Sequence, residues 1–99
     1  MTIEFAVDEL YETGWAPLDT AGCNRDSQGR WFPSLDRVGQ EIDRLGATLE
    51  LEDSDGFGCC TASWCAGQES GRCIAGTRAE AAVHALAQAR RAVLQAVSA

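Results

Sequence analysis

The chain has 99 residues, of which 45% are hydrophobic, and it carries a formal net charge of −7 without a single lysine. This length predicts one domain over residues 1–99. Nucleic-acid backbones and anionic membranes attract clustered Lys and Arg, so the acidic charge argues against direct binding to either. No stretch approaches the roughly 18 apolar residues of a membrane helix. Residues 1–5 do not form a signal segment, so we expect a cytoplasmic protein.

The acidic side chains are concentrated in the first half of the sequence. Residues 1–55 contain thirteen acids and four arginines, whereas residues 56–99 contain two acids and four arginines. The first half therefore has a net charge of −9 and the second half a net charge of +2. A small domain needs less net charge than −9 to stay soluble. The imbalance predicts a surface that binds a basic partner, and a protein that is not an enzyme.

The first predicted helix covers residues 3–11, where apolar residues recur at helical spacing after a capping Thr2. Gly14 supplies a stop signal, and we expect Trp15 to fold back onto the core. The outward positions of this helix are all acidic: Glu4, Asp8, Glu9 and Glu12.

Residues 16–33 are rich in Pro, Gly and polar residues, which predicts a long loop without regular structure. A loop of this length in a compact domain is often functional. It ends in Trp31-Phe32-Pro33, whose aromatic rings either pin the loop to the core or face outward as a contact. Asp26 and Trp31 are our candidate contacts with a partner in this loop.

A second helix is predicted from its cap, Ser34, to Leu45, with Gly46 closing it. Its apolar residues are spaced by 3, 4 and 3 positions and form one stripe: Leu35, Val38, Ile42 and Leu45.

Three strands are predicted over residues 47–52, 57–66 and 72–76, with turns at 53–56 and 67–71. Alternation places Cys60, Ala62 and Trp64 on one face of the middle strand. Thr77 and Glu80 form a capping box before an alanine-rich helix over residues 78–97. The predicted fold is α+β, a three-stranded antiparallel meander packed with three helices, in the order helix-loop-helix-strand-strand-strand-helix.

Four segments of this pattern carry a family resemblance. They are Thr13-Gly14-Trp15 after the first helix, Pro33-Ser34 before the second, the meander, and Gly76-Thr77-Arg78-Ala79-Glu80-Ala81-Ala82 opening the last helix. In these segments the chain resembles the phage ABA-sandwich domain family of small phage and prophage proteins. The polar segment 19–30 and the cysteine-rich middle strand depart from that pattern. The resemblance implies a phage-encoded accessory protein, a class that includes inhibitors of host enzymes and of CRISPR effectors, and it supplies no site residues.

Cysteine chemistry is an alternative basis for function. Four of the five cysteines lie in the predicted hairpin, before His84 on the last helix: Cys59, Cys60, Cys65 and Cys73. Adjacent strand residues point to opposite faces, so Cys59 and Cys60 are poorly placed to share one zinc ion. Cys65 and Cys73 could oppose each other and form a disulfide on oxidation, and either could form a nucleophilic dyad with His84. The remaining interpretation is that these cysteines are small, buried residues with reduced thiols, and that the protein binds no metal and no cofactor.

The acids of the first strand and its turn form the main candidate site: Glu50, Glu52, Asp53 and Asp55. Glu50 and Glu52 share one face, roughly 6–7 Å apart, from a strand rise of about 3.3 Å per residue. This is close to the phosphate spacing along one nucleic-acid strand. The row predicts pairing with Arg and Lys in a groove of a host protein complex, a CRISPR effector being the most concrete case. The alternatives are a structural or dimerising accessory protein and a small thiol or zinc protein.

Overall fold

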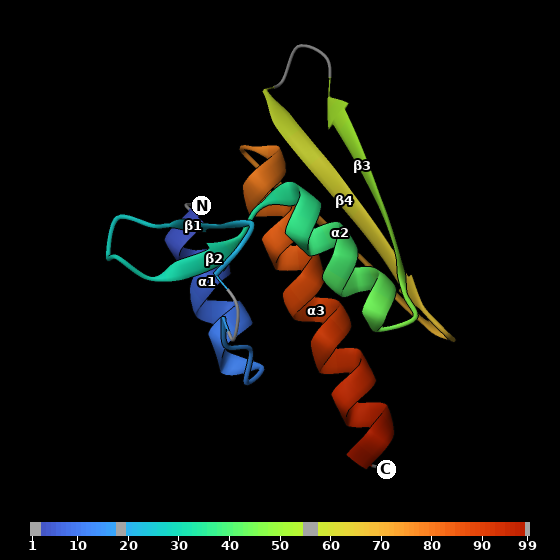
Figure 1. The fold of residues 1–99 in the computed structure, drawn as a ribbon. Helices are drawn as coiled ribbons and strands as arrows, with labels where there is room; N and C mark the ends of the chain where they lie inside the picture. The colour runs from blue at the N-terminus through green and yellow to red at the C-terminus, as the bar shows by residue number, and fades with distance from the viewer. Residues whose placement is uncertain (1–2, 18–19, 55–57, 99) are drawn as a thin grey trace.

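The computed structural model describes residues 3–17, 20–54 and 58–98 and has an α+β fold (Figure 1). Its elements follow the order α1 (Ile3–Glu12), β1 (Cys23–Arg25), β2 (Trp31–Pro33), α2 (Leu35–Arg44), β3 (Thr48–Ser54), β4 (Cys59–Ala66), β5 (Glu69–Ala75) and α3 (Arg78–Ser98). The larger sheet has the strand order β3-β4-β5, and both strand pairs are antiparallel. The predicted fold class and meander are therefore confirmed.

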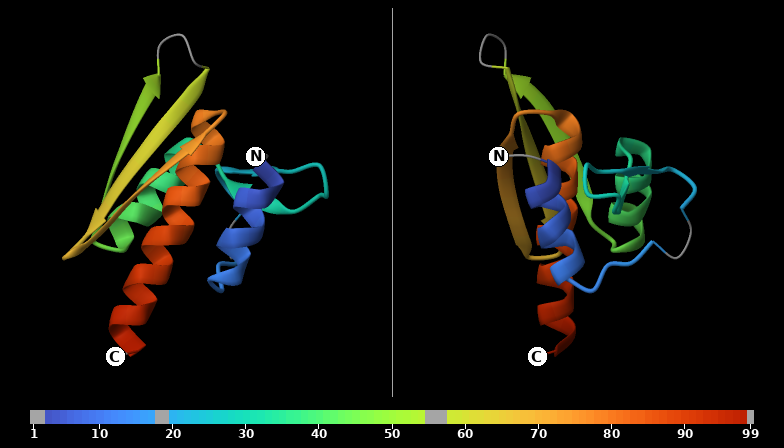
Figure 2. Two further views of the ribbon diagram at one scale, coloured as in Figure 1. Left: turned by 180° about the vertical axis from the view of Figure 1, so that it is seen from behind. Right: turned by 90° about the vertical axis from the view of Figure 1, so that its left-hand side faces the viewer.

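Helix α3 is the centre of the molecule. It lies between the larger sheet and α1, with α2 packed beside it (Figures 1 and 2). Every residue from Glu80 to Ala87 is buried, although the sequence indicated a single apolar stripe. Alanine side chains are small enough for neighbours to approach the helix from several directions, and a helix that is apolar all round is typically buried. None of the described helices has the length and apolar character that a membrane crossing requires.

The helix ends form where local signals predicted them. Ser34 caps α2 by accepting a hydrogen bond from the Arg37 N–H at 3.3 Å. Gly46 follows α2 in the left-handed region, at φ +74°, which glycine adopts without strain. At the start of α3, the Glu80 N–H donates to Thr77 Oγ1 at 3.1 Å, which is one of the two hydrogen bonds of a capping box, whereas the buried Glu80 Oε2 has no hydrogen-bond partner among the described residues. Thr2, the predicted cap of α1, lies outside the described residues.

The prediction of a loop without regular structure over residues 16–33 was wrong. This segment contains a short antiparallel hairpin, β1–β2, in which Asn24 pairs with Phe32. The hairpin turn is closed by the Asp26 N–H, which donates to Arg30 O at 2.9 Å, and by the Gly29 N–H, which donates to Asp26 O at 3.0 Å. Strands of three residues are too short to show alternation, so the sequence pattern could not reveal them. Trp15 and Phe32 are buried, which confirms that the core holds both ends of the segment.

The larger sheet is longer than predicted and is covered on one face only. Strand β3 continues through Asp53 to Ser54, and β5 begins at Glu69, so the first predicted turn starts too early and the second ends too late. Cys60, Ala62 and Trp64 are buried beneath the helices, as their spacing predicted. All three helices lie on that side, and no described segment covers the opposite face, which we call the open face (Figure 2).

Trp64 fixes the packing of β5 onto β4. Its indole Nε1 donates to Gln88 Oε1 of α3 at 2.7 Å, and its ring covers the backbone of its register partner Gly71. A Cβ atom at Gly71 would lie only 2.6 Å from Trp64 Nε1. Because the buried indole is held on both sides, it has little room to move away.

The substitution Gly71→Ala should therefore destabilise the fold by about 1–3 kcal/mol through overpacking against Trp64. Gly76→Ala is the matched control, because a Cβ there meets nothing within 4 Å. Urea unfolding of both variants measures the difference. Equal midpoints for the two variants would show that Trp64 moves freely.

Candidate functional site

The acidic face predicted for α1 is largely used inside the molecule. Three of its four acids make contacts with other elements, and the pairs are Glu4 with Ser27, Asp8 with Arg30, and Glu9 with His84. The remaining acid of that face, Glu12, is exposed at the end of the helix. These contacts attach α1 to the hairpin and to α3, so three of the four carboxylates are engaged within the chain, and Asp8 forms an ion pair there.

Asp26 is a structural residue of the hairpin. Its Oδ1 accepts hydrogen bonds from the Gln28 and Arg30 N–H groups, both at 2.9 Å, and its Oδ2 lies 2.9 Å from the Arg30 guanidinium. The side chain is fully buried. Burial alone would raise the pKa of Asp26, but the hydrogen bonds and the Arg30 charge outweigh it and hold the pKa below its usual value. The prediction that Asp26 contacts a partner is therefore not supported.

Trp31 lies in the same hairpin and is half-buried. Its backbone carbonyl accepts a hydrogen bond from the Tyr11 hydroxyl at 2.6 Å, and the Arg25 guanidinium lies 4.5 Å from the centre of its ring. The hairpin and β3 lie on opposite sides of α3 (Figures 1 and 2). Trp31 and Asp26 therefore do not join the acids of β3 in one surface.

The acids of β3 divide between the two faces of the sheet. Glu50 and Glu52 are exposed on the open face, and neither makes a hydrogen bond or ion pair within the described part of the chain. Asp53 pairs in register with the buried Cys60, and its carboxylate lies 3.7 Å from the Arg78 guanidinium. The predicted row is therefore Glu50 and Glu52, with Asp53 turned to the helix side, and Asp55 lies outside the described residues.

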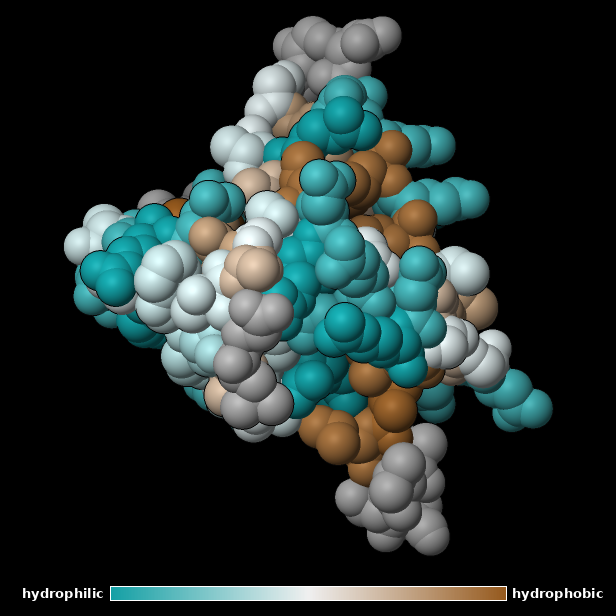
Figure 3. All heavy atoms as spheres, in the orientation of Figure 1, coloured by the Kyte–Doolittle hydropathy of each residue, from teal (hydrophilic) through white to brown (hydrophobic). Residues whose placement is uncertain are grey.

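A groove of about 370 Å³ borders β3 on its helix side. We call it the α2–β3 groove, and it is lined by Leu35, Gly39, Ile42, Asp43, Leu49, Leu51 and Arg78. Figure 3 shows apolar side chains at the surface between α2 and β3, framed by polar ones. The sequence analysis missed this groove, because each apolar stripe was assigned to the core and nothing local indicates that α2 leaves part of β3 uncovered.

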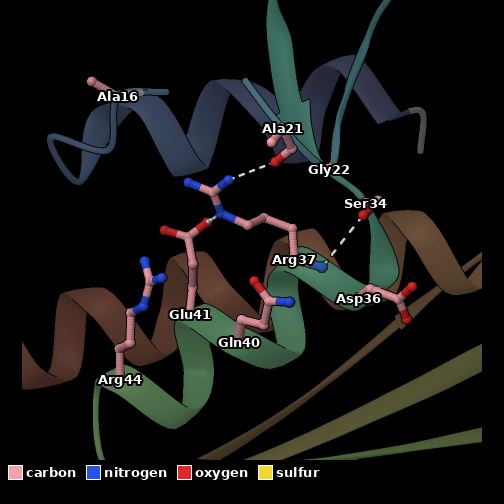
Figure 4. Close-up of a pocket in the computed structure, with 9 residues that line it drawn as sticks. All are labelled: Ala16, Ala21, Gly22, Ser34, Asp36, Arg37, Gln40, Glu41 and Arg44. Atoms are coloured by element: carbon pink, nitrogen blue, oxygen red, sulfur yellow. Dashed lines mark hydrogen bonds and ion pairs between the residues drawn. The ribbon is translucent and has the colours of Figure 1, made fainter. Parts of the chain in front are cut away.

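A larger hollow of about 650 Å³ lies between α2 and the chain that enters the hairpin (Figure 4). Its acids and bases come from α2: Asp36, Arg37, Glu41 and Arg44. Glu41 accepts from Trp15 Nε1 at 2.8 Å, and the Arg37 guanidinium donates to Ala21 O at 2.6 Å, so both attach α2 to its neighbours. The lining contains no histidine or cysteine, and Ser34 is occupied as a helix cap. The described lining therefore holds no hydroxyl or thiol beside a histidine, the arrangement that activates such a nucleophile.

The cysteine alternatives find little support in the geometry. Cys65 pairs with Ser70 and Cys73 with Ala62, so the expected Cys65–Cys73 opposition was wrong, and all five cysteines are free. Among the described residues, no three His, Cys, Asp or Glu side chains are grouped to hold a metal ion.

The proposed cysteine–histidine dyads are not formed. His84 is buried, with Nδ1 2.8 Å from Glu9 Oε2. The Cys73 thiol donates to Ala81 O at 3.3 Å rather than to His84. Burial, with the charge of Glu9 added, raises the pKa of Cys73 to about 11, which disfavours the reactive thiolate. Cys65 is exposed, whereas His84 lies in the buried centre of α3.

No family model, curated protein or solved structure matches this chain. The resemblance to the phage ABA-sandwich domain family therefore stays a prediction, and the function is argued from the geometry.

Asp26→Asn should make the stability of the protein less sensitive to acid. Because the folded-state pKa of Asp26 is lowered, its ionised carboxylate stabilises the fold above the unfolded-state pKa, and this contribution is lost as the pH falls through the folded-state value. Urea unfolding between about pH 6 and pH 3 measures this loss. Asp43→Asn is the control, because Asp43 is exposed. Parallel pH profiles for the wild type and Asp26→Asn would contradict the assigned role.

Thiol reactivity should separate Cys65 from Cys73. Cys65 is exposed, whereas Cys73 has a raised pKa and a hydrogen-bonded thiol. Alkylation by iodoacetamide at about pH 8, followed by peptide mass spectrometry, should modify Cys65 first. The fast phase should disappear in Cys65→Ser. Rapid labelling of Cys73 would instead favour the thiol-protein alternative.

Proposed function

We propose that this protein is a non-enzymatic binding protein that docks on a basic surface of a partner macromolecule through β3. The supporting observation is a contrast between its acids. Three of the four acids on the α1 face, and Asp26 of the hairpin, make hydrogen bonds or ion pairs inside the chain, whereas Glu50 and Glu52 are exposed without an ion pair in the described residues. Uncompensated carboxylates are the groups that Arg and Lys of a partner can pair with, and they also steer its approach.

In its most concrete form, the proposal is a phage-encoded inhibitor that binds a host defence or nucleic-acid-processing complex, such as a CRISPR effector. Glu50 and Glu52 lie two residues apart on one strand, roughly 6–7 Å from each other by strand geometry. Carboxylates at that spacing would occupy the phosphate positions in a basic groove and compete with nucleic acid for it. The protein then binds neither nucleic acid nor membrane itself and needs no cofactor.

Charge reversal on β3 tests this proposal. The double variant Glu50→Lys/Glu52→Lys should lose its basic partner from a host lysate, and capture by the wild type should weaken at high salt because the contact is electrostatic. Glu12→Lys/Glu69→Lys is the matched control, since both residues are exposed, lie away from β3 and give the same change in net charge.

The captured complex then allows a direct test of competition. Added wild-type protein should displace fluorescently labelled DNA or RNA from the purified complex, and the β3 variant should not. Capture that is equal for the two double variants, or that is unchanged at high salt, would refute the proposal. Nucleic acid that stays bound while the complex is saturated with this protein would refute the inhibitor form alone.

A further inference from the structure

Strand β3 is an open edge of the larger sheet. It is seven residues long and pairs with β4 on one side, and no described segment runs along its other side (Figures 1 and 2). In an antiparallel sheet, alternate residues of an edge strand direct their N–H and C=O groups away from the neighbouring strand. Such groups are a template for pairing with another extended chain.

The two faces of this edge differ in chemistry. On the helix side, Leu49 and Leu51 line the α2–β3 groove together with Leu35, which is 41% exposed. Gly39 of α2 widens the groove, because a Cβ atom at this position would meet nothing within 4 Å. On the open face, the same strand presents Glu50 and Glu52. An apolar recess and a pair of carboxylates thus flank one run of unpaired backbone.

We propose that β3 binds an extended segment of the partner as a fourth strand, and that this segment alternates apolar and basic residues. Side chains of a strand point alternately to the two faces of a sheet. The apolar set would enter the α2–β3 groove, and the basic set would lie across from Glu50 and Glu52 as cross-strand ion pairs. This inference rests on the proposed function and specifies which kind of segment the basic partner supplies.

Charge complementarity selects this occupant over a second copy of the chain. Pairing of β3 with the β3 of another copy would bring Glu50 and Glu52 close to the same acids of that copy, and like charges across strands are destabilising. Asp43, exposed at the groove, adds a third carboxylate to the same edge. Glu50 and Glu52 favour a segment that is cationic on the open face, whereas on the groove side the carboxylate of Asp43 is balanced by Arg78 in the same lining.

Two synthetic peptides of identical composition test the alternation. One is a labelled peptide of about eight residues in which Lys and Val alternate, a length that matches β3. The other carries the same residues as a Lys block followed by a Val block. We expect fluorescence anisotropy to show about tenfold or tighter binding of the alternating peptide, because only this peptide can place both sets of side chains on the correct faces.

The substitution Gly39→Leu tests the contribution of the α2–β3 groove to binding separately from that of the charged residues. Leucine is the better helix former, so the variant should unfold at the same or a higher temperature than the wild type. Its side chain would occupy the groove, so affinity for the alternating peptide should fall about tenfold. Glu50→Lys/Glu52→Lys should weaken the same binding, whereas Glu12→Lys/Glu69→Lys should retain most of it.

Each outcome decides the inference. Equal binding of the two peptides, or full binding of the alternating peptide by a folded Gly39→Leu variant, would overturn strand addition. The proposed function would still stand in that case if Glu50→Lys/Glu52→Lys no longer captured the partner. A wild-type dimer that Gly39→Leu dissociates, with no peptide binding, would assign the edge to a second copy and overturn the inference. Unchanged capture and unchanged peptide binding in the β3 charge variant would overturn both proposals.

Discussion

The fold depends on the close packing around α3. From Glu80 to Ala87 this helix has no exposed residue, and its neighbours are the sheet, α1 and α2. Alanine at positions 81, 82, 85, 87 and 89 keeps the distance between layers short, and each of these residues is almost fully buried. A larger side chain at these positions would push the layers apart, since protein interiors have few voids to absorb extra atoms.

Burial of α3 also explains why the acids of α1 belong to the fold. His84 is 3% exposed, and Glu9 supplies a hydrogen-bond partner for its Nδ1, whereas its buried Nε2 has none among the described residues. Farther along α3, the Arg90 guanidinium donates to Thr13 Oγ1 at 2.9 Å, just after α1 ends. Polar contacts therefore hold α1 against α3 at two points along the helix, and Oε2 of Glu9 is engaged in one of them.

The placement of all helices on one face of the sheet has a consequence for binding. One central helix with α1 and α2 around it fills the covered face, so the open face and the β3 edge stay accessible (Figure 2). Glu50 and Glu52, which have no ion pair among the described residues, lie at that accessible edge beside the α2–β3 groove. The same packing that engages three acids of α1 thus leaves Glu50 and Glu52 where a partner can reach them.

The sequence by itself determined the α+β class, the meander, α2 with its Ser34 cap and α3 with its Thr77 cap, because caps, helical spacing and strand alternation are local signals. It also determined that Glu50 and Glu52 share a face, since the period of a strand is two. Only the tertiary structure decided that Asp26 is buried against Arg30, that Asp53 turns toward Arg78, and that α2 leaves a groove beside β3. Ion pairs, strand edges and grooves depend on which distant segments meet in space, and this information is absent from any local pattern of residues.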